Sequence, residues 1–96
     1  MPGIVRVQLD QHIGHAKRKT PFHQTPYKIG SPNVYVNGQP AVRIGDSTFC
    51  NDKAAEGSTT VFVNNIGVHR FGDKTTGHDG WVPNKAATGS SNVIAG

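Results

Sequence analysis

The chain places one soft metal ligand, an imidazole or a thiolate, four or five residues after each of three aspartates. These pairs are Asp10 and His15, Asp46 and Cys50, and Asp73 and His78. Mixed nitrogen and sulfur ligands are natural for zinc, and the chain has no carboxylate or methionine arrangement that would support iron or copper redox chemistry. The spacing therefore predicts a zinc clamp that contains His15, Cys50 and His78.

A structural zinc site is normally closed by four ligands, so one is still needed. His23 is the predicted fourth ligand, because it lies in the segment PFHQTP, where two prolines would stiffen the backbone around the imidazole. His12, in the same loop as His15, and His69 are alternatives for this place. Such a site would dominate the folding free energy, since structural zinc contributes on the order of 10 kcal/mol or more in small peptides.

An internal repeat must position these residues. The stretch Gly30–Asp46, GSPNVYVNGQPAVRIGD, is written again 27 residues later as Gly57–Asp73, GSTTVFVNNIGVHRFGD. A third copy is divided between the termini: Gly89–Gly96 opens it, and Ile4–Asp10 closes it with one extra residue before the aspartate. A repeat unit that cannot bury its apolar face alone is completed by its neighbours. The divided unit therefore predicts that the two termini meet and that three units close around a pseudo-threefold axis.

Each unit is predicted to contain a β-hairpin. Val34–Val36 and Val61–Val63 are β-branched and aromatic triplets, followed by Asn-Gly or Asn-Asn, which tolerate a positive φ. The alternating residues of Val42–Ile44 and His69–Phe71 are expected to form the second arms, with one face directed inward.

The connecting loops all follow the aspartate of one unit and precede the Gly-Ser of the next, at residues 11–29, 47–56 and 74–88. They should gather at one end of the axis, and the tight turns at the other. The predicted fold is all-β: a small cone of three pseudo-threefold β-hairpin repeats, with irregular loops at a zinc-bound apex. The single domain 1–96 would divide into units of about 30–56, 57–88, and 89–96 together with 1–29.

The composition indicates a small domain whose apolar core is too small to stabilise it without a metal or a partner. Hydrophobic residues make up 34% of the chain, below the ~45% of ordinary domains. The single cysteine excludes an internal disulfide and leaves a metal or a partner as the source of added stability. With no apolar run near the ~18 residues of a membrane span and no leader pattern, a soluble protein made in the bacterial cytoplasm without a signal peptide is expected.

Two other functions were weighed against a structural role. The net charge of +4 suits a polyanionic partner, which makes a free-standing zinc module that contacts nucleic acid the alternative. The densest basic cluster, Lys17–Lys19, is typical of a solvated surface, and no nucleic acid is expected. A cysteine hydrolase built on Cys50 fits no local signature, and a metal would consume the thiolate. Asp46 and Asp73 are instead predicted to brace their turns or pair with the repeated arginines, Arg43 and Arg70.

The repeated GSPxVxVNGxPxxRxGD pattern and the terminal GSSNV resemble the PAAR-repeat proteins over nearly the whole chain. Those proteins are the sharpened spike tips of type VI secretion systems and of contractile-tail bacteriophages. The resemblance implies one zinc near the point of a cone, held by three histidines and one cysteine. Carried over by position, the ligands are His15, His23, His78 and Cys50, while His69 stands where some phage relatives have a histidine.

The resemblance also implies the partner, a trimeric β-helical spike (VgrG or the phage central spike) whose blunt end is capped by one monomer. The expected docking base is the tight-turn end, around Asn37-Gly38, Asn64-Asn65 and Ala95-Gly96. The implied task is mechanical: piercing the target outer membrane, with possible effector cargo and no catalysis. A self-contained tip is favoured because nothing follows Gly96.

Overall fold

The computed structural model describes residues 2–12, 15–17, 20–23, 25–49, 52–76 and 85–96, with the backbone alone for 15–17 and 20–23. Every regular element in these ranges is a strand, which confirms the all-β fold. The strands form three antiparallel pairs, β1 with β2, β3 with β4, and β5 with β6. Their bounds are His15–Lys17 (β1), Thr20–His23 (β2), Tyr35–Val36 (β3), Gln39–Pro40 (β4), Phe62–Val63 (β5) and Ile66–Gly67 (β6).

The pairs β3–β4 and β5–β6 are the two predicted hairpins, but their second arms are shorter than the sequence suggested. The register joins Tyr35 to Pro40 and Phe62 to Gly67, and each arm is two residues long. The chain beyond β4 also pairs with neighbouring units, because Ala41 bridges Arg6 and Arg43 bridges Val68. Ala41 keeps backbone hydrogen bonds to Val34 and Ser31 of its own unit, so the repeats are joined by backbone contacts both within and between units.

A closed ring of three hydrogen bonds marks the pseudo-threefold axis. The N–H of Val5 donates to the carbonyl of His69 (3.0 Å), that of His69 to Val42 (2.9 Å), and that of Val42 back to Val5 (3.0 Å). These residues occupy equivalent positions in the three units, and all three are fully buried. The prediction that His69 points inward where another unit has Val42 is confirmed.

On the loop side of this ring, the loop stems pair around the axis in a collar. The six antiparallel bridges of the collar are Gln11 with Pro26, Tyr27 with Thr48, Ser47 with Lys53, Ala54 with Thr75, Lys74 with Lys85, and Ala86 with His12. Each bridge joins the stem that follows one aspartate to a stem that returns toward a Gly-Ser. The collar thus places the start of every loop beside the next loop.

Two small apolar clusters fill the interior. One contains the hairpin and terminal residues Ile4, Val36, Ala41, Val63, Val68 and Ala95. The other contains ring and collar residues, Val5, Val7, Tyr27, Val42, Ala54 and Ala86. Four of these twelve side chains are alanine methyl groups, so the apolar area removed from water is modest, as the composition suggested.

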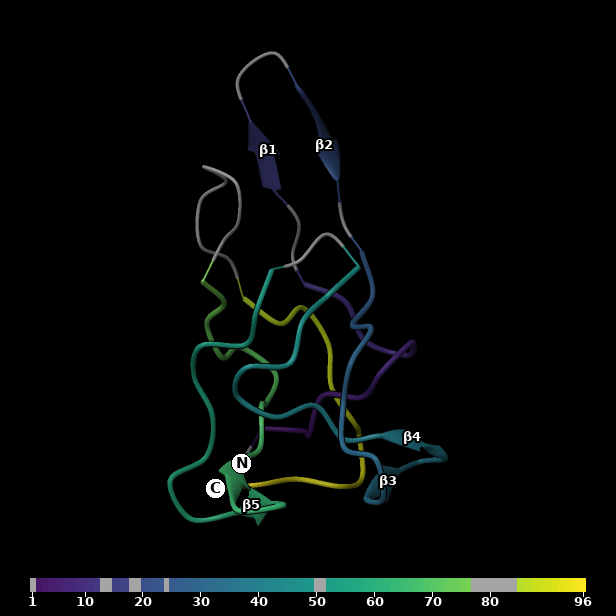
Figure 1. Cartoon of the computed structure of the whole chain (residues 1–96), viewed down its shortest axis with the longest axis vertical. Coiled ribbons are helices and arrows are strands. Elements are labelled where there is room, and N and C mark those ends of the chain that lie inside the picture. Colours follow the sequence, from purple (N-terminus) through teal and green to yellow (C-terminus); the bar gives the residue numbers. More distant parts are fainter. Residues whose placement is uncertain (1, 13–14, 18–19, 24, 50–51, 77–84) are drawn as a thin grey trace.

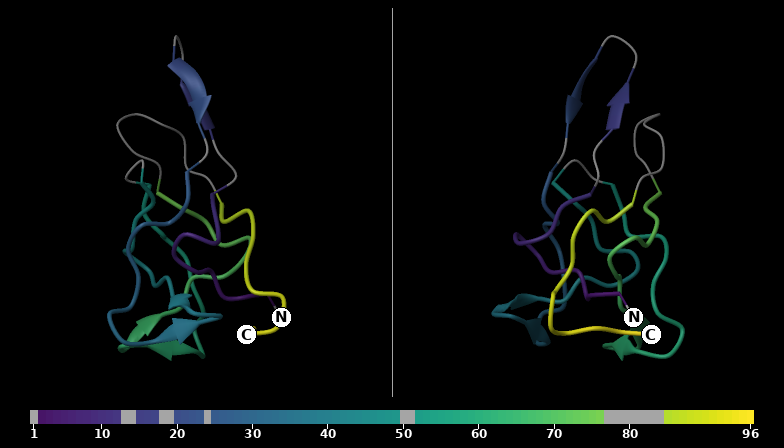
Figure 2. Two further views of the ribbon diagram at one scale, coloured as in Figure 1. Left: turned by 90° about the vertical axis from the view of Figure 1, so that its right-hand side faces the viewer. Right: turned by 180° about the vertical axis from the view of Figure 1, so that it is seen from behind.

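The molecule is elongated, with principal extents of 39 × 23 × 23 Å. The hairpins β3–β4 and β5–β6 lie at one end together with both termini, while β1–β2 projects at the opposite end (Figures 1 and 2). Gly3 bridges Ile94, so the termini meet as the divided repeat requires. The first loop departs from the expectation of irregular structure, because it contains β1 and β2.

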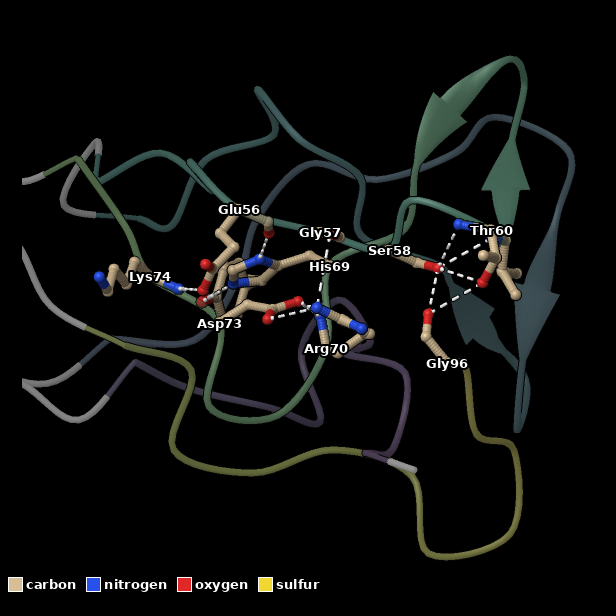
Figure 3. Close-up of polar contacts among 11 residues, drawn as sticks. Glu56, Gly57, Ser58, Thr60, His69, Arg70, Asp73, Lys74 and Gly96 are labelled. Atoms are coloured by element: carbon tan, nitrogen blue, oxygen red, sulfur yellow. Dashed lines mark hydrogen bonds and ion pairs between the residues drawn. The ribbon is translucent and has the colours of Figure 1, made fainter.

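The serine that follows each repeat glycine ties its unit to the turn of the next unit. These side-chain bonds run from Ser31 to Asn64 (2.6 Å), from Ser58 to the Gly96 carbonyl, and from Ser90 to Asn37 (2.7 Å). Gly96 lies six residues after its serine, as the two turn asparagines do. Its backbone oxygen accepts the bond that an amide side chain accepts elsewhere, and Figure 3 shows it beside Ser58 and Thr60. The three bonds form a second closed cycle, at the hairpin end.

The repeated arginines and aspartates pair within each unit. The Nε–Oδ2 distances are 2.8 Å for Arg6–Asp10, 2.9 Å for Arg43–Asp46 and 2.8 Å for Arg70–Asp73. In every pair the arginine backbone N–H also donates to the same carboxylate oxygen. The hydrogen bond to the carboxylate raises the pKa of each arginine. The predicted pairing of Asp46 and Asp73 is confirmed, and the split unit repeats it.

The hairpin turns offer a test of backbone strain. Asn37 and Gly38 have φ values of 52° and 84°, and Asn64 and Asn65 have 55° and 65°. A side chain in this left-handed region costs about 1 kcal/mol relative to glycine. Asn65→Gly should therefore raise the free energy of unfolding by up to about 1 kcal/mol in urea denaturation. Gly38→Ala is the converse control, because its new Cβ meets nothing within 4 Å and adds only the φ penalty. Equal stability of Gly38→Ala and the wild type would contradict the argument.

Candidate metal centre

The structure describes the backbone of two of the four predicted ligands, His15 and His23. His15 and His23 are register partners in the β1–β2 pair, so their backbones lie directly opposite each other. Cys50 and His78 lie outside the described residues. Within the described ranges, no group of three or more His, Cys, Asp or Glu side chains is close enough to hold a metal ion.

The described residues that lead toward these positions are buried. His12, Thr48 and Thr75 each follow a repeat aspartate by two residues, and their side chains are almost completely inaccessible. Asp52 is also fully buried, and Cys50 is two residues from both Thr48 and Asp52 in the sequence. Imidazoles and a thiolate are the donor types of a zinc site, and the backbones of two of these residues, His15 and His23, are paired.

A network of polar contacts lies inside the collar. The Thr75 hydroxyl donates to Asp52 Oδ2 at 2.8 Å, and His12 Nδ1 lies 3.9 Å from the same oxygen. The backbone N–H of Asp52 donates to Thr48 Oγ1 at 3.1 Å. The backbone N–H of Thr25 donates to His12 Nε2 at 2.9 Å. We call these five residues, His12, Thr25, Thr48, Asp52 and Thr75, the polar layer.

The contacts of His12 fix its role. Because the Thr25 N–H donates to Nε2, that nitrogen carries the lone pair, and the neutral ring holds its proton on Nδ1, facing the Asp52 carboxylate. His12 was one alternative for the fourth ligand. Its Nε2 lone pair accepts a bond from Thr25, so in this structure His12 joins two loop stems.

His69, the second alternative, is held by protein groups at both ring nitrogens. Nδ1 lies 2.7 Å from the Glu56 carbonyl oxygen and must donate to it, because a carbonyl only accepts. Nε2 then accepts from the Tyr27 hydroxyl at 2.9 Å. Figure 3 shows the imidazole directed toward Glu56 from the strand that also carries Arg70. With both nitrogens occupied, His69 serves the core.

The burial of His69 predicts a dependence of stability on pH. Burial lowers the pKa of His69, although the Glu56 carbonyl and the charges of Asp73 and Glu56 oppose this shift; Arg70 adds to it. The folded protein therefore binds the proton less readily than the unfolded chain. The free energy of unfolding should fall as the pH drops below the ordinary histidine pKa of about 6.5, and should not depend on this group above it.

Two variants isolate the contribution of the His69 imidazole. Tyr27→Phe keeps the titrating ring, whereas His69→Val combined with Tyr27→Phe replaces it with the residue found at the equivalent positions 5 and 42. Urea denaturation between pH 5 and pH 8 should show a weaker loss of stability in the double variant than in Tyr27→Phe. Identical pH profiles for the two variants would show that the pKa of His69 is the same in the folded and unfolded protein, which would contradict the lowered pKa.

The polar layer contains residues that the search for soft ligands missed. Asp52 and the three threonines were not considered as part of the site. One signal was present, because His12, Thr48 and Thr75 share one repeat position, two residues after the aspartate. Asp52 has no such signal. Its role follows only from its contacts with Thr48, Thr75 and His12.

Comparison with known families agrees with this architecture. A family model described as PAAR motif matches residues 19–82, two thirds of the chain. The matched range contains both complete repeats and excludes the two segments of the divided one, 4–10 and 89–96. No curated protein sequence matches the chain. None of the described segments is a helix long and apolar enough to cross a membrane.

Proposed function

Because the chain belongs to the PAAR motif family, whose members are structural spike tips rather than enzymes, we propose that it is the pointed tip of a contractile injection machine. In this role one molecule caps the blunt end of a trimeric β-helical spike, of the VgrG or phage central spike kind. The observation that carries the proposal is the closed hydrogen-bond ring of Val5, Val42 and His69. A single chain with three equivalent sides can match a true threefold end without forming an oligomer.

The hairpin end has the features of a docking base. Tyr35, Phe62 and Ile94 occupy one position in the three units, and 59%, 58% and 52% of their surfaces are exposed. The residue that follows each of them, Val36, Val63 or Ala95, is buried in the core, so these three large side chains lie on the outer face of their strands or segments. Tyrosine and phenylalanine are enriched in protein interfaces. We call Tyr35, Phe62 and Ile94 the apolar triad and assign it to the spike contact.

A zinc ion bound at the loop end would hold the three loops together at the apex of the cone. His15, His23, Cys50 and His78 are the proposed ligands, a donor set that suits a closed tetrahedral site. Bound zinc supplies a cross-link among the three loops, which holds them together while the tip is driven through a membrane. The collar supports this assignment, because it already brings the stems of all three loops around one axis.

The experiment that tests the function is reconstitution with a trimeric β-helical spike. Native mass spectrometry of the mixture should give one tip per three spike chains. Denatured spike is the control for nonspecific association. A free-standing zinc module would remain unbound to the spike and would bind nucleic acid or another polyanion in a parallel filter assay. That pair of results would overturn the spike-tip function.

A further inference from the structure

The polar layer reaches every loop that carries a proposed ligand. In the sequence Thr25 is two residues from His23, Asp52 is two from Cys50, and His12 and Thr75 are each three from the remaining ligands, His15 and His78. The layer lies inside the collar, between the apolar core and the loop end.

Asp52 is the shared element of the layer. Its carboxylate accepts from Thr75 of the third loop at 2.8 Å and faces His12 of the first loop at 3.9 Å, while its backbone is bonded to Thr48 in its own loop. His12 in turn accepts a hydrogen bond from the Thr25 N–H, in the returning arm of the first loop. Both Asp52 and His12 are fully buried. Hydrogen bonds are stronger away from water, so the bonds of Asp52 to Thr75 and of His12 to Thr25 restrict the loop stems.

We propose that Asp52, with His12 and Thr75, positions the metal-binding loops and sets the affinity of the apex for zinc. The inference rests on the zinc apex proposed above. Groups that orient metal ligands without touching the metal typically change affinity 10- to 100-fold when they are removed. The physical reason here is that three separate loops must converge on one ion. Stems already fixed to one carboxylate lose less conformational freedom when the ion binds.

The test compares Asp52→Asn with Asp46→Asn. Both changes remove a buried carboxylate from the unit 30–56, but the Asp46 carboxylate pairs with Arg43 in the body of the molecule, whereas that of Asp52 accepts from Thr75 in the polar layer. Zinc affinity is measured by competition with a chromophoric chelator on the full chain. Asp52→Asn should raise the dissociation constant 10- to 100-fold, and Asp46→Asn should leave it within about threefold of the wild type.

Cobalt substitution supplies a readout that a purely structural role would not change. The thiolate-to-cobalt charge-transfer band and the ligand-field bands report the geometry around the ion, and Asp52→Asn should shift or broaden them while Asp46→Asn leaves them as in the wild type. If Asp52→Asn fails to fold, Thr75→Val and Thr75→Ser replace it. Thr75→Val removes the hydroxyl that bonds Asp52 and should weaken zinc binding, and Thr75→Ser should restore it.

The outcomes separate this inference from the function on which it rests. A wild-type chain that binds neither zinc nor cobalt would overturn both the zinc apex and the positioning role. Wild-type binding with equal affinities and spectra for Asp52→Asn and Asp46→Asn would overturn only the positioning role. A selective loss in Asp52→Asn and Thr75→Val, with recovery in Thr75→Ser, would support it.

Discussion

Removal of zinc by a chelator should lower the free energy of unfolding by on the order of 10 kcal/mol at pH 7. That is as large as the whole stability of a typical domain. The reason lies in the core: over the ranges that the structure describes, its two clusters contain twelve buried apolar residues, four of which are alanines. The hydrogen bonds around the axis fix the path of the chain, but each one contributes only about 1 kcal/mol to the free energy of unfolding. The metal-free chain is expected to be close to unfolded at 37 °C.

Cys50→Ser tests the same cross-link from the protein side. It should destabilise the protein about as much as the chelator does, and the chelator should then have little further effect on the variant. This non-additivity is the control, because a change in packing at Cys50 would add to the effect of metal loss. Urea denaturation with elemental analysis of each sample measures both. An unchanged midpoint in a sample shown to be free of metal would contradict a stabilising zinc.

The pseudo-threefold arrangement could be predicted because the sequence contains an internal repeat. Alignment of the copies placed His69 at an inward position, paired Arg43 with Asp46, and required the termini to meet. Each of these results follows from comparing residues at the same position in the three repeat copies. In a closed threefold arrangement equal positions in the repeat have equal environments, so a pattern in one unit constrains the other two.

Contacts between units could not be predicted in the same way. The sequence suggested long hairpin arms, whereas from Val42 onward the backbone bonds to neighbouring units in the ring of Val5, Val42 and His69. The sequence alone also does not show why a glycine recurs before each of these serines. A Cβ at Gly57 would lie 2.7 Å from the Val68 carbonyl oxygen. The glycine is therefore required by the close approach of the backbone at Val68, later in the same unit.

The candidate site also has a part that could be predicted from the sequence and a part that could not. Soft ligands can be recognised by residue type, so His15, His23, Cys50 and His78 stand out before any fold is known. Asp52 does not, because a lone carboxylate in a loop is ordinarily a solvated residue. Its burial and its contacts with two other loops are tertiary facts. Contacts also add information on the two alternative ligands: His69 bonds Glu56 and Tyr27 through its two ring nitrogens, and His12 Nε2 accepts from Thr25.

Placing a charge in the apolar triad should abolish capping of the spike. Fully burying a large apolar side chain contributes about 1.5–3 kcal/mol, and an unpaired carboxylate in the same place adds a desolvation penalty of several kcal/mol. Phe62→Asp should therefore weaken binding to the trimeric spike at least 100-fold, and Tyr35→Asp combined with Phe62→Asp should leave no detectable complex. Titration calorimetry with the purified spike measures both. The fold should tolerate these changes, because both side chains are exposed in the free molecule.

Phe49→Asp is the matched control for this prediction. Phe49 is also an exposed aromatic, at 49% of its surface, but it follows Thr48 in the collar and its N–H is bonded to Pro26, away from the hairpins. Its substitution changes charge and hydrophobicity equally and should leave spike binding intact. Equal losses for Phe49→Asp and Phe62→Asp would mean that general surface charge governs binding. Loss confined to Phe49→Asp would place the spike contact on the flank of the collar, so the comparison identifies which end of the cone meets its partner.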